Sequence, residues 1–546
     1  MSVKFIFVTG GVISGLGKGI LTASIGKILQ NIGFKVTAIK IDPYLNFDAG
    51  TMRPTEHGEV WVTYDGGETD QDLGNYERFL GINISKAHNI TSGKVLLPVL
   101  EKERRGEYLG KTVMYIPHVT NEIKEQLINI VKKSKMKYDF VIVEIGGVVG
   151  DYENILFLKA AQQIEYEYPV MYIEIAYLPT PDNLGEMKTK PMQHAITALG
   201  QLGIRPHIVV GRGKVSLDKP RKEKISVSSG IPQARIFSAP DLKNVYSMPL
   251  ILEKQGISRE ILKFFNIKKK YKKTINIWED YIKKIYSYKD IVKVGIVGKY
   301  IDSGKFTLKD SYLSVIEAIK HAAWHNSRIS DIVWIDSKDV EKDKKNLNIL
   351  ENLDCVIVPG GFGDSGIEGK ILTAQYCREN KIPYLGLCLG LQVAVIEYAR
   401  NVCKMGKANS EEFNIHTRYP VIATIEEQKK LLKKKLYGGT MRLGSWPAEL
   451  KKSSLVYKLY NNKRVIYERH RHRYEVNPKF IKNLEKRGLV FSGKSPDGVL
   501  VEFIELNQRD HPFFVGTQAH PEFTSRVLKP NPLFNGLIKA GIDNKK

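Results

Sequence analysis

Two series of short apolar runs, each followed by stretches with helical spacing, constrain the fold more than any other feature of the sequence. In the first half, the runs are rich in Val, Ile and Phe at consecutive positions, which is typical of strands buried on both faces of a parallel sheet. Strands that alternate with helices predict an α/β fold with helices on both faces of the sheet. The expected strands of this series are Val3–Thr9, Lys35–Ile41, Tyr138–Ile145, Val170–Ala176 and His207–Gly211.

A second series of the same kind begins at Lys293 and predicts a second α/β sheet. Its further expected strands are Ile332–Ile335, Leu353–Pro359 and Pro383–Leu387. Between the two series, a stretch rich in Lys and Tyr has only weak periodicity. We therefore predict two doubly wound, mostly parallel sheets, with a first domain over residues 1–270, a linker over 271–291 and a second domain over 292–546.

Composition restricts the setting in which the protein works. No apolar run reaches the roughly 18 residues of a membrane span, and the first residues lack the layout of a signal peptide. The four cysteines form no CxxC pair, which favours a reducing cytoplasm over a disulfide framework or a zinc site. The formal net charge of +24 could indicate a polyanionic partner or a lysine-rich solvated surface. Because no RNA-reading aromatic motif accompanies the lysine runs, we expect no nucleic-acid partner. The lack of a long apolar run likewise predicts no membrane partner.

A glycine-rich run between the first strand and a helix predicts a phosphate site. In residues 9–20, TGGVISGLGKGI, glycines let backbone N–H groups approach a triphosphate, and Lys18 would reach its terminal phosphates. The strict P-loop pattern is not met, since Val12 occupies a glycine position and Gly19 replaces the Ser or Thr that binds Mg²⁺. An ordinary strand–helix connection is the alternative. If Mg²⁺ binds, Asp72 and Glu144 are the candidate ligands, because Glu144 ends a strand at the edge where such sheets bind ligands.

The segment Lys188–Gln193 brings two lysines and an amide together beside a proline. It could hold a second phosphate group, or it could be a solvated loop, and the residues alone leave both open.

The second half contains the parts of a cysteine-based amide hydrolase. Gly386-Leu387-Cys388-Leu389-Gly390 follows an apolar strand and precedes a helix, as in a nucleophile elbow, and a helix N-terminus stabilises a thiolate. Downstream, His520-Pro521-Glu522 supplies a base and a carboxylate to orient it. The loop Pro359–Gly363 follows another strand and can offer N–H groups to an oxyanion. A buried structural cysteine with an unrelated histidine is the alternative for each motif taken alone.

These motifs resemble those of known families. PGGFG at 359–363, GLCLG at 386–390 and HPE at 520–522 resemble class I glutamine amidotransferases. In the first half, the phosphate loop, DPY at 42–44, HGEV at 57–60, VEIGG at 143–147 and KTKP at 188–191 resemble CTP synthases, as do GGTMRLG at 438–444 and ERHRHRYEVN at 468–477. The resemblance implies that ATP phosphorylates the 4-oxygen of UTP and that ammonia released from glutamine displaces phosphate to give CTP.

The resemblance also implies roles for individual residues. Cys388, His520 and Glu522 would be catalytic, and Asp72 and Glu144 would hold Mg²⁺. ATP would be bound by Gly15, Leu16, Gly17, Lys18, Gly19, Ile20, Asp72, Pro240, Asp241 and Leu242. UTP would be bound by Ser14, Lys188, Thr189, Lys190, Pro191, Met192, Gln193 and Lys224. Glutamine would be bound by Gly361, Leu389, Gly390, Leu391, Gln392, Glu412 and Arg471. Product CTP would be sensed by Ser14, Asp151, Tyr152, Glu153, Lys188 and Lys224. The family resemblance further implies activation by GTP and a homotetramer that can form filaments.

Two other functions remain compatible with the residues. A related amidoligase with the same glutaminase and phosphate loop could amidate a carboxylate on a larger acid, although this would leave Lys188–Gln193 without a role. A chain that has kept the fold only for assembly or nucleic-acid binding would account for the charge, but it would not need the Cys–His–Glu set.

Overall fold

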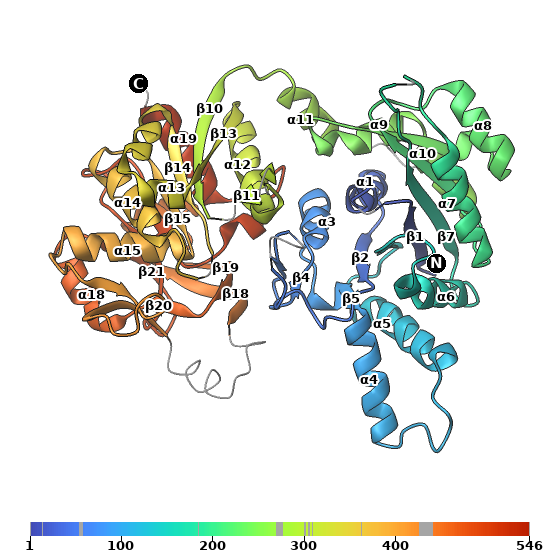
Figure 1. Cartoon of the computed structure of the whole chain (residues 1–546), viewed down its shortest axis with the longest axis horizontal. Helices are drawn as coiled ribbons and strands as arrows, with labels where there is room; N and C mark the ends of the chain where they lie inside the picture. Colours follow the sequence, from blue (N-terminus) through green and yellow to red (C-terminus); the bar gives the residue numbers. More distant parts are fainter. Residues whose placement is uncertain are drawn as a thin grey trace. The chain divides into compact units, whose positions relative to one another are not determined.

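The structure is a computed structural model that describes most of the chain. The described residues are 2–13, 15–53, 58–183, 185–268, 277–299, 302–303, 306–307, 309–361, 363–424 and 441–544. The chain divides into two compact units: unit 1 consists of Met1–Ala49 with Asp72–Lys283, and unit 2 consists of Gly50–Gln71 with Lys284–Lys546. Each unit is built around its own sheet (Figure 1).

Unit 1 contains a seven-stranded sheet in the order β5-β2-β6-β1-β7-β8-β9, and every neighbouring pair is parallel. Its strands are β1 (Lys4–Gly11), β2 (Val36–Asp42), β5 (Asn89–Thr91), β6 (Phe140–Ile145), β7 (Val170–Tyr177), β8 (Ile208–Gly213) and β9 (Ile236–Pro240). In β1, Phe5 and Phe7 point into one core and Ile6 and Val8 into the other, because side chains of a strand alternate between its faces. This explains why the strand is apolar at consecutive positions.

Helices cover both faces of this sheet. One face packs against α1 (Lys18–Asn31), α9 (Met248–Lys254) and α10 (Ile257–Phe264). The other face packs against α4 (Ser92–Arg104), α5 (Thr120–Lys133), α6 (Ile155–Ile164) and α7 (Lys190–Gln201). The unit also contains α3 (Asp72–Leu80) and α8 (Lys219–Ser229).

Unit 2 contains a nine-stranded sheet in the order β13-β10-β14-β15-β23-β22-β21-β18-β19. The strands are parallel from β13 to β23 and antiparallel from β23 to β19. Their bounds are β10 (Ile291–Gly298), β13 (Ile329–Asp336), β14 (Cys355–Val358), β15 (Tyr384–Leu387), β18 (Arg442–Leu450), β19 (Val465–His472), β21 (Val490–Lys494), β22 (Val501–Glu505) and β23 (Phe514–Thr517).

Helices also cover both faces of the second sheet. The core on one face includes α13 (Ser337–Lys342), α14 (Ile367–Glu379), α15 (Leu389–Asn401) and α18 (Pro478–Glu485). The core on the other face includes α12 (Leu313–His325), α17 (Leu455–Leu459) and α19 (Pro532–Asn544). A small sheet of β16 (Ala408–Ser410), β17 (Tyr419–Thr424) and β20 (Tyr474–Val476) lies beside the first of these cores. The predicted α/β class, with a sheet in each half, is confirmed, whereas the antiparallel extension of the second sheet gave no recognised signal in the sequence.

The two compact units differ in two ways from the predicted division into two domains joined by a linker at residues 271–291. Residues 50–71, which include β3 (Trp61–Val62) and β4 (Glu68–Thr69), belong to unit 2 although the sequence around them belongs to unit 1. The predicted linker also contains helix α11 (Ile277–Ile285), whose Trp278 is buried and donates a hydrogen bond to Tyr246 O at 3.1 Å. Across the described parts of the chain, no helix combines the length and the apolar character needed to cross a membrane.

Candidate active sites

Cys388 lies in a tight turn between strand β15 and helix α15. Its backbone has φ 52° and ψ −101°, and residues other than glycine rarely adopt a positive φ. Its N–H donates to Thr517 O at 2.7 Å, which joins the turn to strand β23. A Cβ on Gly386 would meet the backbone of Gly390, and a Cβ on Gly390 would overlap Val358 O. The two glycines are therefore required for close packing, and the turn has the geometry of a nucleophile elbow.

His520 and Glu522 form a hydrogen-bonded pair next to this turn. His520 Nδ1 lies 2.7 Å from Glu522 Oε1, and the backbone N–H of His520 donates to Arg469 O at 2.7 Å. Burial alone would lower the pKa of His520. The negative charges of Glu522 and then of Cys388 raise it more strongly, so the pKa of His520 rises to about 10. The imidazole is therefore held in its protonated form beside the thiol near neutral pH.

The three residues share a pocket in unit 2 with two residues predicted to bind glutamine, Gly361 and Arg471. Gly360 also lines this pocket, and a Cβ built on it would lie 2.9 Å from His520 Cε1 and 3.6 Å from Cys388 Cβ. The loop after β14 therefore packs directly against the cysteine and the histidine. Such a position is where an oxyanion loop has to lie.

The other predicted glutamine residues surround this loop and helix α15. Glu412 Oε1 accepts a hydrogen bond from Gly363 N at 3.1 Å, and burial raises the pKa of Glu412. Residues Leu389–Gln392 form the first turn of α15, where the side chain of Gln392 donates to Tyr474 O at 2.9 Å.

Residues 50–71 contribute a wall to the same pocket, which the sequence did not predict. Glu59 and Val60 line the pocket, and the carboxylate of Glu59 accepts hydrogen bonds from the backbone and the hydroxyl of Ser314. Glu68 Oε1 lies 2.8 Å from Arg471 Nε, and both side chains are largely buried. Glu59 of HGEV and Glu68 of ETDQD were visible in the sequence, but nothing in it indicated that they lie on the second unit.

In unit 1, the phosphate loop connects β1 to α1 through several residues with positive φ. Val12 has φ 83°, and Gly15 and Gly17 have φ 71° and 82°. Lys18 is the first residue of α1, and its buried Nζ donates to Gly147 O at 2.8 Å. Burial lowers the pKa of Lys18. Ser14 lies outside the described residues.

The predicted metal ligands Asp72 and Glu144 lie together, and a lysine that the sequence analysis missed lies between them. Lys40 Nζ is 2.9 Å from Glu144 Oε1, forms a very short contact with Asp72 Oδ2 and is 3.7 Å from Asp42 Oδ1. Burial raises the pKa of Glu144 and Asp72 raises it further, whereas Lys40 lowers it. The only signal for Lys40 was its place in an otherwise apolar strand.

Gly19 lies against the carboxylate of Asp72. A Cβ at position 19 would overlap Asp72 Oδ1. The missing Ser or Thr of the P-loop pattern thus leaves room for a carboxylate from α3, which fits the expectation that a metal ion here would take oxygens from outside the loop.

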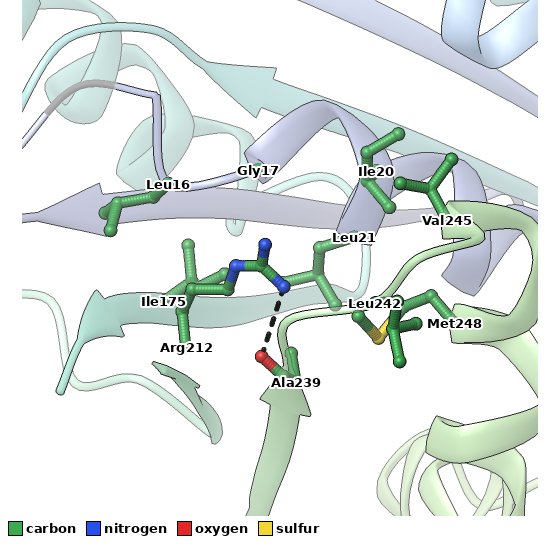
Figure 2. A pocket seen from close by; sticks show the side chains of 10 residues that line it. All are labelled: Leu16, Gly17, Ile20, Leu21, Ile175, Arg212, Ala239, Leu242, Val245 and Met248. Carbon is green, nitrogen blue, oxygen red and sulfur yellow. Dashed lines mark hydrogen bonds between the residues drawn. The ribbon is translucent and has the colours of Figure 1, made fainter. Parts of the chain in front are cut away.

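An apolar pocket opens beside the phosphate loop (Figure 2). It is lined by Leu16, Gly17, Ile20, Leu21, Ile175, Arg212, Ala239, Leu242, Val245 and Met248. The predicted adenine residue Leu242 thus lies in one pocket with loop residues. The other two predicted adenine residues, Pro240 and Asp241, lie next to it in the chain and contact the pocket residue Arg212. The guanidinium of Arg212 donates to Pro240 O at 2.8 Å and pairs with the Asp241 carboxylate at 2.8 Å. Arg212 was not singled out from the sequence.

The predicted UTP residues lie around helix α7. Lys190, Pro191, Met192 and Gln193 form its first turn, and Thr189 precedes it. Glu186 Oε2 lies 3.0 Å from Lys188 Nζ, and the pKa of Glu186 is lowered by Lys188 first and also by Lys224. Lys188 and Lys224 are therefore close enough for both to act on one carboxylate.

The predicted product-sensing residues follow β6. Asp151 Oδ2 accepts a hydrogen bond from Val148 N at 2.9 Å, and Tyr152 and Glu153 continue into a short 3₁₀ helix. Tyr152 is 91% exposed, so it is not held by packing within the described chain.

Comparisons with known proteins match both halves. Residues 4–267 match the model of the CTP synthase N-terminus, and residues 307–540 match that of class I glutamine amidotransferases. A CTP synthase of Methanocaldococcus jannaschii is 49% identical over 551 residues, with 99% of each chain covered. One of Pyrococcus abyssi is 48% identical, with 100% of this chain and 98% of the relative covered. A solved Trypanosoma brucei CTPS glutaminase domain with bound acivicin is 36% identical, covers 46% of this chain and 94% of its own, and has a TM-score of 0.42.

The two domains define a glutamine amidotransferase joined to a nucleotide-dependent synthase. The similarity over the whole length is more specific. The chain belongs to the CTP synthase family, ATP-dependent ligases that form CTP from UTP with nitrogen from glutamine. The resemblance inferred from the motifs is confirmed, and UTP, rather than a carboxylic acid, is the acceptor.

Proposed function

We propose that Cys388, His520 and Glu522 carry out the glutaminase half of the reaction. The observation that carries the proposal is the 2.7 Å contact between His520 Nδ1 and Glu522 Oε1 in the pocket that Cys388 lines. The Cys388 thiolate attacks the side-chain amide carbon of glutamine. The His520 imidazolium then donates its proton to the departing nitrogen, while Glu522 fixes the ring and stabilises its charge.

Glutamine is held on two sides in this proposal. The guanidinium of Arg471 pairs with its α-carboxylate, and Glu412 pairs with its α-amino group. N–H groups of Gly361 and Leu389 face the oxygen that becomes negative as the carbon turns tetrahedral, and Gly390, Leu391 and Gln392 complete the pocket. Water then releases glutamate from Cys388.

Phosphoryl transfer to UTP takes place in unit 1. The N–H groups of Gly15–Ile20 and the ammonium of Lys18 bind the ATP phosphates, and Leu242 contacts the adenine together with the adjoining Pro240 and Asp241. Lys188–Gln193, Lys224 and Ser14 bind UTP. Transfer of the γ-phosphoryl group makes the 4-oxygen of UTP a leaving group, and ammonia displaces it as phosphate.

Mg²⁺ fits the carboxylates in this proposal. Asp72 and Glu144 already converge on the cation of Lys40, and Gly19 leaves room for Asp72 next to the phosphate loop. Asp72 and Glu144 would hold the ion, which supplies charge neutralisation at the phosphates when bound.

Regulation and setting complete the proposal. Product CTP acts as a feedback inhibitor that binds to Asp151–Glu153 together with Ser14, Lys188 and Lys224. GTP activates the glutaminase. The protein works as a cytoplasmic homotetramer that can form filaments. The free cysteines, Cys355, Cys377, Cys388 and Cys403, are consistent with a reducing compartment.

Replacement of the nucleophile tests the proposal. The Cys388→Ala variant should lose glutamine-dependent CTP formation completely, while CTP formation from added ammonium chloride stays within about twofold of the wild type, because two separate sites do the two steps. Cys355→Ala, another buried thiol outside the pocket, is the matched control and should retain both activities. Glutamine-dependent CTP formation by Cys388→Ala would contradict the assignment.

A further inference from the structure

Lys370 is a fully buried lysine that the glutaminase chemistry described above does not use. It lies in the first turn of α14 with 0% exposure, and its Nζ donates to Pro359 O at 3.0 Å. Burying an ammonium group is costly unless it is hydrogen-bonded or paired. The carbonyl it contacts belongs to the loop that packs against Cys388 and His520.

The contact determines the direction of a peptide group at the reacting centre. In a trans peptide the C=O of one residue and the N–H of the next point in opposite directions, so holding Pro359 O fixes the direction of the Gly360 N–H. Gly360 is the residue whose added Cβ would meet His520 and lie close to Cys388, and Gly361 follows it in the same pocket. Because Gly361 follows directly, a change in the direction of this peptide would also shift the next one, which carries the Gly361 N–H.

A second buried lysine holds the other end of the loop. Lys299, which follows β10, is 6% exposed, and its Nζ donates to Gly363 O at 2.6 Å. The Pro359–Gly363 loop is therefore held at its first and last carbonyls by the side-chain amines of two lysines. Packing alone does not need these charges, because methionine would fill a similar volume at position 370 without the cost of desolvation.

The electrostatics of Lys370 agree with this geometry. Burial lowers the pKa of Lys370 to about 7 and Lys299 lowers it further, whereas Cys388 and Asp336 raise it. Lys370 thus interacts electrostatically with the cysteine without contacting the substrate.

We propose that Lys370 is a positioning residue for the glutaminase reaction: by holding Pro359 O, it fixes the peptide that leads into Gly360 and so keeps the following Gly361 N–H directed at the oxyanion. The proposal rests on the assignment of Cys388 as nucleophile. Loss of a direct oxyanion donor typically costs about 10²–10³ in kcat. Because Lys370 acts through the loop, loss of its amine should cost about 10–100-fold in the kcat of glutamine hydrolysis, with KM changed less than about threefold.

The test compares Lys370→Met with Thr373→Val. Thr373 is also fully buried on α14, and its hydroxyl donates to Gly369 O at 2.8 Å within the helix, so Thr373→Val removes a buried polar group without contacting the loop. We expect Lys370→Met to lose glutaminase kcat and Thr373→Val to retain it. CTP formation from ammonia should be unchanged in both. An equal loss in Thr373→Val, or a Lys370→Met defect confined to KM, would overturn the proposal.

Two thiol probes separate positioning of the loop from an effect on the thiol. Glutamate γ-semialdehyde adds reversibly to a thiolate to give a tetrahedral oxyanion, so its affinity should fall in Lys370→Met about as much as kcat. Chloroacetamide alkylates a thiolate by displacing chloride and needs no oxyanion site, so its rate at Cys388 should stay within about threefold of the wild type. A parallel fall in the alkylation rate would show that Lys370 acts on the thiolate and would overturn the proposal.

A further variant and a control keep the result interpretable. Lys370→Gln retains an N–H donor and should recover part of the lost kcat. If Lys370→Met does not fold, Lys370→Gln is compared with Lys370→Leu instead. The proposal is then supported only if Lys370→Gln keeps wild-type kcat and aldehyde affinity while Lys370→Leu loses both. If Lys370→Gln and Lys370→Leu are equally active, the hydrogen bond has no role. The nucleophile assignment is checked separately, because chloroacetamide labelling of a cysteine other than Cys388 would contradict that assignment and not the role of Lys370.

Discussion

The two units place their reactive groups at the same kind of position, the carboxyl end of a parallel strand, but they build the turn that follows in different ways. In unit 1, β1 leads into a loop with several positive-φ residues before α1 begins at Lys18. In unit 2, β15 leads into α15 through Cys388 alone. A long turn presents many N–H groups to an extended anion, whereas a one-residue turn projects one side chain. The long turn therefore has the geometry that suits phosphate, and the one-residue turn has the geometry that suits a nucleophile.

The two sites also differ in how their charges are balanced. In unit 1, one lysine, Lys40, lies among three carboxylates, and the reactive cation Lys18 has a pKa lowered by burial. In unit 2, one carboxylate, Glu522, supports an imidazolium. Removal of a single charge should therefore affect the two sites differently.

The largest effect is expected for Lys18→Ala. Without this ammonium at the terminal phosphates, CTP formation should fall by about 10³-fold with glutamine or ammonia as the nitrogen source. Glutamine hydrolysis without nucleotides should survive, because its residues lie in the other unit. Coupled measurement of CTP and glutamate tests this, and normal ammonia-dependent synthesis would exclude the phosphate role.

Lys40→Met should reduce CTP formation by about 100-fold at neutral pH. Lys40 lowers the pKa values of both Asp42 and Glu144, so its loss raises both. Because the reaction requires ionised carboxylates, activity should then recover towards higher pH. The acidic limb of the pH profile for ammonia-dependent CTP formation should therefore shift to higher pH. The matched control is Lys4→Met, a largely buried lysine of β1 outside the site, which should leave the profile in place.

Glu522→Gln should lower glutaminase kcat by about 30-fold, because the imidazole loses the carboxylate that orients it. The main group that raises the pKa of His520 is also lost, so the alkaline limb of the glutaminase pH profile should move to lower pH. The free energy of unfolding should depend on pH for the same reason. A histidine with a raised pKa stabilises the fold fully below its unfolded pKa, and this stabilisation is lost as the pH rises towards about 10 in the wild type. Urea unfolding at several pH values checks this, and an unchanged alkaline limb would contradict it.

The smallest effect is expected for Glu68→Gln. The amide keeps the size of the side chain but weakens the pairing with Arg471, so the KM for glutamine should rise about fivefold, close to 1 kcal/mol, while kcat changes little. Ammonia-dependent synthesis is the internal control. An unchanged KM would show that Glu68 does not position Arg471 for glutamine.

Local patterns were sufficient for much of the fold. The apolar runs at consecutive positions predicted strands such as β1 and β7 to within a few residues, because a strand buried on both faces must be apolar throughout. The antiparallel half of the second sheet was missed, since β18 and β19 contain buried charged residues that do not look like strand interior; Arg442 of β18, for example, pairs with Glu502 of β22 at 2.6 Å. Helix α11 was also missed, because its charged residues interrupt the buried face formed by Trp278, Ile282 and Ile285.

By itself, the sequence determined the family and the α/β class, and it supplied the candidate groups of each site, because glycine turns, a cysteine elbow and a phosphate loop are local features with local causes. Tertiary structure alone decided that Glu59 and Val60 line the glutaminase pocket, that Lys40 lies between Asp72 and Glu144, and that Lys370 holds the loop beside Cys388. These contacts join residues from separate elements. Their energies come from burying charges next to partners that no local pattern specifies.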